Sequence, residues 1–172
     1  MKNLSKIFIL VFIGLLGFSP LSGYSQLMED YPTMDQLIGT KAKDFTLASL
    51  EGKAVKYSDL VKEGEKAIVF FWATWCPHCR EALDEFNSHA DQYKLKNIKI
   101  IFVDVGEKPE IVKQYAQKNN TQFEVLLDTD YQLVLSYGFT GVPAFVLIDA
   151  KGIVKDAQNQ LPQNYEEILS ST

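Results

Sequence analysis

Cys76 and Cys79 are the residues of this chain best placed to do chemistry, and the chain has no other cysteine. They are separated by Pro77 and His78, and they follow the apolar run Ala67–Trp72, which is typical of a buried strand. An amphipathic pattern begins at the cysteines, so the pair is predicted to lie at a strand-to-helix junction. Free backbone amides and the helix dipole stabilise a thiolate there. The spacing therefore predicts a thiol–disulfide redox pair.

Each residue of this Cys-Pro-His-Cys motif has an expected role. Cys76, at or just before the first helical turn, is expected to be the exposed nucleophile of low pKa. Cys79, one turn further along, is expected to resolve a mixed disulfide on Cys76. Pro77 suits the first helical position, because its missing N–H has no intrahelical partner there. A protonated His78 would add positive charge beside the thiolate, lower its pKa and make the disulfide a better oxidant.

A metal site is the first alternative for these residues. A closed zinc site takes four ligands, but the chain has no second Cys-x-x-Cys and only one further histidine, His89. His89 is predicted to lie on the same helix as Cys79, about 15 Å along it. We therefore expect no metal ligand and no cofactor, and a metal-binding module remains the less favoured hypothesis.

The N-terminus has the pattern of a secretory signal peptide. Lys2 and Lys6 flank the start of the apolar run Ile7–Phe18, and small residues permit cleavage after Ser25. As a helix, this run covers about 18 Å, well short of the ~30 Å hydrocarbon core of a bilayer. We therefore expect a cleaved signal over residues 1–25 and export to a bacterial periplasm.

The remainder is predicted to form a polar lead-in over residues 26–40 and a single domain over residues 41–172. The full chain has a net charge of −5, and loss of the signal would remove two lysines and no acid. This balance argues against nucleic acid as a partner. A disulfide between residues three apart closes too short a loop to staple a fold, which favours a catalytic role for the cysteines.

Periodicity along the domain predicts an α/β fold. We expect a mixed, mostly parallel sheet with helices on both faces. The predicted elements are a hairpin over 44–57, a helical turn over 58–61, strands over 67–72, 99–105, 122–127 and 143–149, a return strand over 153–155, and helices after residue 76 and over 109–119, 130–137 and 162–170.

The segment Phe71–Arg80 resembles the active-site segment of the thioredoxin superfamily. It is most similar to the exported TlpA/ResA/CcmG-like branch, which is grouped with the AhpC/TSA and redoxin families. The resemblance spans Lys41–Ser170 and implies a thioredoxin-like fold with an N-terminal β-hairpin and a strand-helix insertion within residues 105–138. The Pro-His dipeptide instead resembles DsbA, a strong oxidant.

Gly141-Val142-Pro143 resembles the cis-proline loop of the same family. The resemblance implies a cis peptide at Pro143, packed beside the cysteines. It also implies that the Val142 backbone pairs with an extended client chain, and that Trp75 contributes to client binding.

Two positions depart from the family pattern. Phe70 stands where thioredoxin has a buried aspartate that helps to deprotonate the second cysteine, and Glu81 is expected to point outward rather than replace it. Asp84 stands where many relatives have a helix-kinking proline, so we expect a straighter helix after Cys76.

The main functional hypothesis is an exported thiol–disulfide oxidoreductase that reduces disulfides in client proteins. The resemblance implies clients such as apocytochromes and a membrane redox partner that re-reduces the cysteines. The same residues working in reverse would make a DsbA-like thiol oxidant, and the direction stays open. A peroxiredoxin-like peroxidase would need threonine three residues before the cysteine, where the chain has Ala73.

Overall fold

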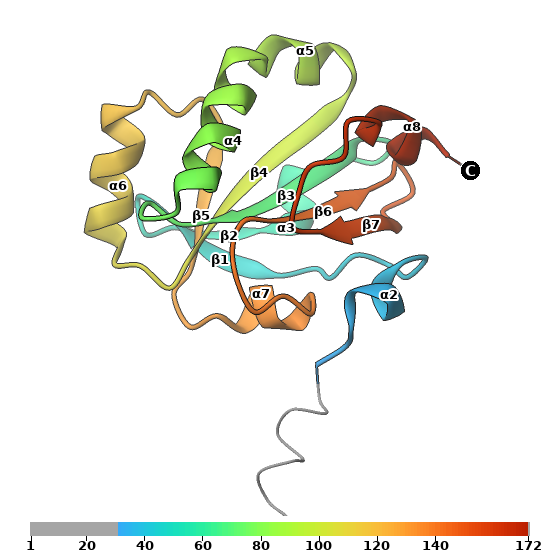
Figure 1. Cartoon of the computed structure of the whole chain (residues 1–172), viewed down its shortest axis with the longest axis horizontal. Coiled ribbons are helices and arrows are strands. Elements are labelled where there is room, and N and C mark those ends of the chain that lie inside the picture. The colour runs from blue at the N-terminus through green and yellow to red at the C-terminus, as the bar shows by residue number, and fades with distance from the viewer. Residues whose placement is uncertain (1–30, 172) are drawn as a thin grey trace, which may run out of the picture. The chain divides into compact units, whose positions relative to one another are not determined.

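The computed structural model describes residues 31–171, in which strands and helices alternate along the chain (Figure 1). The strands of this part are β1 (Thr46–Ser49), β2 (Ala54–Lys56), β3 (Lys66–Trp72), β4 (Ile98–Val105), β5 (Glu124–Asp128), β6 (Ala144–Ile148) and β7 (Val154–Gln158). Its helices are α2 (Met34–Leu37), α3 (Tyr57–Leu60), α4 (Pro77–Ser88), α5 (Ala90–Leu95), α6 (Pro109–Lys118), α7 (Gln132–Ser136) and α8 (Tyr165–Ser170). None of these helices has the length and apolarity needed to cross a membrane.

The described strands form one mixed sheet in the order β2-β1-β5-β4-β3-β6-β7. The prediction of a mostly parallel sheet is wrong. Only the central pairs β3·β4 and β4·β5 are parallel in this part of the chain. The pairs β1·β2, β1·β5, β3·β6 and β6·β7 are antiparallel. The two outermost pairs, β1·β2 and β6·β7, are hairpins, whose strands must run in opposite directions. The pairs β1·β5 and β3·β6 join strands that are distant in the chain, and no local pattern reports their direction.

The inserted strand-helix element joins the centre of the sheet to its N-terminal hairpin. α6 and β5 follow β4, and β5 then lies between β4 and β1. Because β5 is parallel to β4, the connection between them must cross over, and α6 supplies that crossover. Because β3 and β4 pair directly in parallel, the loops that follow them lie next to each other at the same edge of the sheet.

Helices cover both faces of the sheet, as predicted (Figure 1). Side chains alternate along β3, so that Val69 and Phe71 enter one core and Phe70 and Trp72 the other. The first core is closed by α2, α3 and α7, and the second by α4, α5, α6 and α8. The second core contains both cysteines and is the one that positions the site.

The helix after Cys76 runs without a break through Asp84, but it does not continue through His89, which we expected to lie on the same helix. α4 ends at Ser88, and α5 begins at Ala90, with His89 outside helical geometry at φ −114° and ψ 18°. The Ser88 hydroxyl donates to the Glu85 carbonyl at 2.8 Å, and the His89 ring lies 3.0 Å from the same oxygen. Side chains that bond a carbonyl of the preceding turn compete with the helix ladder, which explains the break.

The predicted signal peptide over residues 1–25 lies outside the described residues. Part of the predicted lead-in, which showed no clear period in the sequence, has regular structure. Within it, Leu37 of α2 is buried in the first core, and the Gly39 amide donates to the Val154 carbonyl at 2.8 Å. The described end of the lead-in therefore packs on β7 as part of the domain.

Candidate active site

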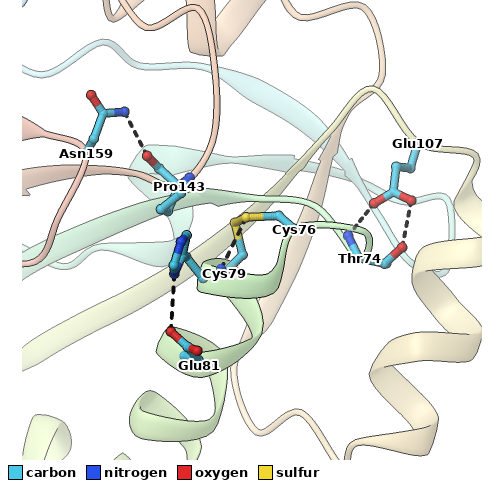
Figure 2. The surroundings of a disulfide bond; sticks show 8 residues. Thr74, Cys76, Cys79, Glu81, Glu107, Pro143 and Asn159 are labelled. Carbon is cyan, nitrogen blue, oxygen red and sulfur yellow. Dashed lines mark hydrogen bonds and ion pairs between the residues drawn. A yellow bond between two sulfur atoms is a disulfide. The ribbon is translucent and has the colours of Figure 1, made fainter.

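The cysteine pair lies at the start of α4, after the short loop that follows β3. Cys76 is the N-cap residue of α4, and the Cys76 amide donates to the Ala73 carbonyl at 3.2 Å, which closes the connecting loop. A disulfide joins Cys76 to Cys79, with 5.2 Å between their Cα atoms (Figure 2). The Cys79 amide donates to Cys76 Sγ at 3.2 Å. A helix N-terminal amide aimed at this sulfur would stabilise it as a thiolate once the disulfide is reduced.

The two cysteines differ less in solvent exposure than the sequence predicted. Cys76 is 3% exposed and Cys79 is 0% exposed. The expectation of an exposed Cys76 is therefore wrong for the disulfide form. The apolar second core and the adjoining Val142 enclose the pair, because a disulfide is itself an uncharged, apolar group. What exposure remains belongs to Cys76, which is the only one of the two that a client sulfur could approach.

The two residues between the cysteines lie on the surface. Pro77 occupies the first turn of α4, as its missing donor allows. The His78 side chain is 81% exposed, and its Nδ1 lies 3.3 Å from Glu81 Oε2 (Figure 2). Glu81 is itself 77% exposed and points to solvent. Solvent screening and the negative charge of Glu81 both reduce the electrostatic effect that a protonated His78 would have on Cys76.

The Val142–Pro143 peptide bond is cis, and it lies across from the cysteine pair in Figure 2. The Asn159 side chain, at the end of β7, donates from Nδ2 to the Pro143 carbonyl at 2.8 Å. This contact links the start of β6 to the segment after β7. The sequence did not single out Asn159, because no pattern connects it to Pro143.

Residues of the cis-proline loop line two depressions, to which the neighbours of the cysteines also contribute. An apolar pocket of about 130 Å³ is lined by Trp75, Val142 and Phe139 among others. A wider cleft of about 480 Å³ is lined by residues that include His78 and Pro143. Trp75 is 66% exposed, although it is a large aromatic side chain. Of the predicted client-binding residues, Trp75 and Val142 thus line the apolar pocket and Pro143 lines the wider cleft.

Beneath the cysteines, the position of the missing acid is filled by an aromatic cluster. The Phe70 ring stacks on Phe145 with 4.6 Å between centroids, and it packs against Phe86 at 5.6 Å and Phe102 at 5.7 Å. All four side chains are nearly or fully buried. The floor of the site is therefore apolar, and it offers Cys79 no titratable group.

The nearest buried acid lies one strand away and was missed in the sequence. Asp104, on β4, pairs in register with Trp72 and is 1% exposed. Within residues 31–171 neither of its carboxyl oxygens has a hydrogen-bond partner. Burial, followed by the neighbouring Glu107 carboxyl, raises the pKa of Asp104 to about 8. The available signal was one acid inside the otherwise apolar run Ile100–Val105.

Glu107, in the loop after β4, is the second acid that the sequence did not single out. It contacts Thr74, two residues before Cys76, through both carboxyl oxygens (Figure 2). This contact joins the loops that follow the two central parallel strands. It also brings a carboxyl group beside the segment that carries the reactive sulfur.

Comparisons with known proteins agree with this geometry. The AhpC/TSA family matches residues 38–157. Thiol-disulfide oxidoreductase ResA of Bacillus anthracis is 31% identical over 148 residues, which cover 86% of this chain and 82% of ResA. Sporulation thiol-disulfide oxidoreductase A of Bacillus subtilis (strain 168) is 26% identical over 157 residues, which cover 90% of this chain and 87% of that protein.

A solved structure extends the agreement to the fold. The Chlorobium tepidum structure named for the thiol:disulfide interchange protein DsbE matches with a TM-score of 0.66 at 30% identity. The match covers 77% of this chain and 92% of that one. The predicted thioredoxin-like fold is thereby confirmed. The chain belongs to the AhpC/TSA family and is a TlpA/ResA-like thiol-disulfide oxidoreductase whose Cys-x-x-Cys pair, Cys76 and Cys79, forms a disulfide.

Proposed function

We propose that this oxidoreductase reduces disulfides in exported client proteins, with Cys76 as the nucleophile and Cys79 as the resolving thiol. One observation carries the assignment of roles: Cys76 Sγ accepts the Cys79 amide at the N-terminus of α4, whereas Cys79 lies inside the helix and is fully buried. The first sulfur is both the better stabilised thiolate and the more accessible one.

The reaction begins from the reduced pair. The Cys76 thiolate attacks one sulfur of a client disulfide, forms a mixed disulfide and releases the other client sulfur as a thiolate. Cys79 then loses its proton and attacks Cys76 Sγ. This step forms the Cys76–Cys79 disulfide and releases the second client thiolate, so that two electrons have passed to the client. The short distance between the two Cα atoms, 5.2 Å, permits this closure without a large backbone movement.

Client binding is assigned to Trp75, Val142 and Pro143. Trp75 and Val142 line the apolar pocket beside Cys76, which suits an uncharged client side chain next to the reacting cysteine. Val142 precedes β6 and supplies backbone groups to which an extended client segment could bond as an added strand. Shared backbone recognition of this kind tolerates many client sequences.

Export and a redox partner complete the proposal. The signal pattern over residues 1–25 supports transport out of the cytoplasm, where disulfides form and persist. Each client turnover leaves the cysteine pair oxidised, so a second protein must return two electrons to it. A membrane protein that carries reducing equivalents across the bilayer would meet this need, and the clients could include apocytochromes awaiting haem attachment.

A thiol oxidant acting in the reverse direction is the second candidate. It is favoured by His78, which adjoins the cysteine pair and would stabilise the reduced thiolate when protonated. The reduction potential decides between the candidates, since thioredoxin-like and DsbA-like values differ by ~150 mV. Equilibration with glutathione measures it. A potential near the thioredoxin value supports the reductant, and one near the DsbA value supports the oxidant.

A trapping experiment tests the roles of the cysteines. Cys79→Ser should accumulate mixed disulfides between Cys76 and client proteins, because the resolving thiol is absent. Cys76→Ser should accumulate none, and it serves as the matched control. Adducts on Cys76→Ser in place of Cys79→Ser would reverse the assignment, and adducts on neither would refute it.

A further inference from the structure

The loop that leads from β3 to Cys76 is bonded by a side chain from the loop after β4. The Thr74 amide donates to Glu107 Oε2 at 2.5 Å, and the Thr74 hydroxyl donates to Glu107 Oε1 at 2.7 Å. The two residues are 33 positions apart in the sequence. Figure 2 shows the carboxyl group facing Thr74 with both oxygens engaged. A two-point contact of this kind fixes orientation as well as distance.

Glu107 is in turn held by the residue before it. The Gly106 amide donates to the Asp128 carbonyl at 3.0 Å, which ties the loop after β4 to the end of β5. Gly106 has φ +80°, and a Cβ at this position would lie 2.1 Å from the Tyr131 ring. The left-handed backbone favours glycine at this turn, and a side chain here would require the Tyr131 ring to move. The bond from Gly106 to Asp128 therefore ties the backbone next to Glu107 to the sheet.

Thr74 transmits this placement to the reactive sulfur. The loop is closed on its other side by the bond from the Cys76 amide to the Ala73 carbonyl, so residues 73–76 are restrained at both ends. Cys76 Sγ must stay within reach of the Cys79 amide for the helix terminus to stabilise its thiolate. A shift of the loop that lengthens this 3.2 Å contact would weaken the hydrogen bond from the Cys79 amide to Cys76 Sγ.

We propose that Glu107 is a positioning residue for Cys76, holding the loop through Thr74 so that the sulfur remains at the N-terminus of α4. The inference rests on the proposed role of Cys76 as the nucleophile. Glu107 acts here through its two contacts and not through its charge. A carboxylate near a thiolate would by charge alone disfavour it, so the two effects have opposite signs.

Paired substitutions separate contact from charge in the reduced protein. Glu107→Ala removes both contacts, and the midpoint of the Cys76 thiolate titration should rise by about one pH unit, a tenfold change in the ionisation equilibrium. Glu107→Gln can still accept from the Thr74 amide and donate to the Thr74 hydroxyl, so its midpoint should stay near that of the unmodified protein. The ultraviolet absorbance of the thiolate and the pH dependence of iodoacetamide alkylation both report this midpoint.

Two further variants complete the test. Glu110→Ala removes an exposed acid three residues away on α6, and it should leave the midpoint unchanged. Thr74→Val should raise the midpoint by less than Glu107→Ala does, and Thr74→Ser should restore it. The threonine pair also tests the proposal if Glu107→Ala fails to fold.

The outcomes that overturn the proposal are distinct. A folded Glu107→Ala with an unchanged midpoint would show that the contact does not position Cys76. A lowered midpoint in both Glu107 variants would show that charge dominates. Absence of mixed disulfides in Cys79→Ser alone would instead refute the client-reducing function, because the titration needs no client.

Discussion

The carboxyl ends of β3 and β4 lie side by side in the sheet but have opposite chemistry. β3 ends in buried aromatic residues, continues into the loop with Thr74 and delivers the two cysteines. β4 ends with buried Asp104 and, three residues later, Glu107. Trp72 and Asp104 are paired in register on neighbouring strands. The aromatic end of β3 and the acidic end of β4 are therefore only one strand spacing apart.

This difference shows how the molecule controls its thiols without an acid beneath them. Phe70 and its neighbours keep the floor of the site apolar, and Glu107 contacts the loop through Thr74. Control of Cys76 is then exerted by the terminus of α4 and by the placement of the loop before it.

Placing an acid on the β3 side should have the largest effect. Phe70→Asp would lose the stacking with Phe145 and bury an unpaired carboxyl, so the free energy of unfolding should fall by about 5 kcal/mol or more. Urea unfolding measures the loss. Phe70→Leu, which keeps the site apolar, should lose much less. A Phe70→Asp variant as stable as Phe70→Leu would show that the floor accepts charge.

Removing the acid from the β4 side should stabilise the protein at high pH. The raised pKa of Asp104, about 8, means that between about pH 4 and 8 the folded chain keeps a proton that the unfolded chain has released. Stability contributed by this group is therefore present at low pH and is lost as the pH rises through the folded pKa. Asp104→Asn should remove the decline and be more stable at pH 9 by a few kcal/mol.

Urea unfolding from pH 5 to pH 9 checks this prediction. Glu110→Gln, which neutralises an exposed acid on the neighbouring helix, should retain the pH dependence of the unmodified protein. If the free energy of unfolding falls equally steeply with pH in Asp104→Asn and in the unmodified protein, the fall in stability is not caused by Asp104.

Loosening the cis-proline loop should have a smaller effect, confined to client capture. Asn159→Ala removes the bond to the Pro143 carbonyl, which is worth about 1 kcal/mol, so mixed-disulfide formation in a Cys79→Ser background should slow by about fivefold. The Cys76 thiolate midpoint should not change, because this contact is on the client side. Asn164→Ala is the control, since Asn164 makes no side-chain cap contact. A changed Cys76 thiolate midpoint in Asn159→Ala would contradict the expectation that the cis-proline loop and the loop before Cys76 act independently.

The smallest expected effect is that of His78. His78→Gln should make the protein more reducing by less than ~30 mV, because the ring is 81% exposed and faces Glu81. Glu81→Gln should shift the potential in the opposite direction by a similar amount. Glutathione equilibration measures both shifts. A shift several times larger for His78→Gln would restore the dominant role that the motif suggested.

The contrast between His78 and Glu107 shows where sequence reasoning stops. His78 stands out because it lies inside a motif, yet its strength depends on exposure and on Glu81, which motif spacing does not report. Glu107 lies in an unremarkable loop and gains its role from Thr74, 33 positions earlier. The sheet was predicted as mixed, but its antiparallel edges depended on pairings between strands distant in the chain.

The sequence by itself determined the redox pair and its local frame. An apolar strand, a proline at the first helical position and thiols one helical turn apart are short-range features, because a helix brings residues three apart onto one side. Only the tertiary structure decided what surrounds that pair: the aromatic floor, the buried Asp104 and the contacts of Glu107 and Asn159. These depend on which strands lie next to one another, and the order of strands in a sheet follows from burial of the whole chain rather than from any local run of residues.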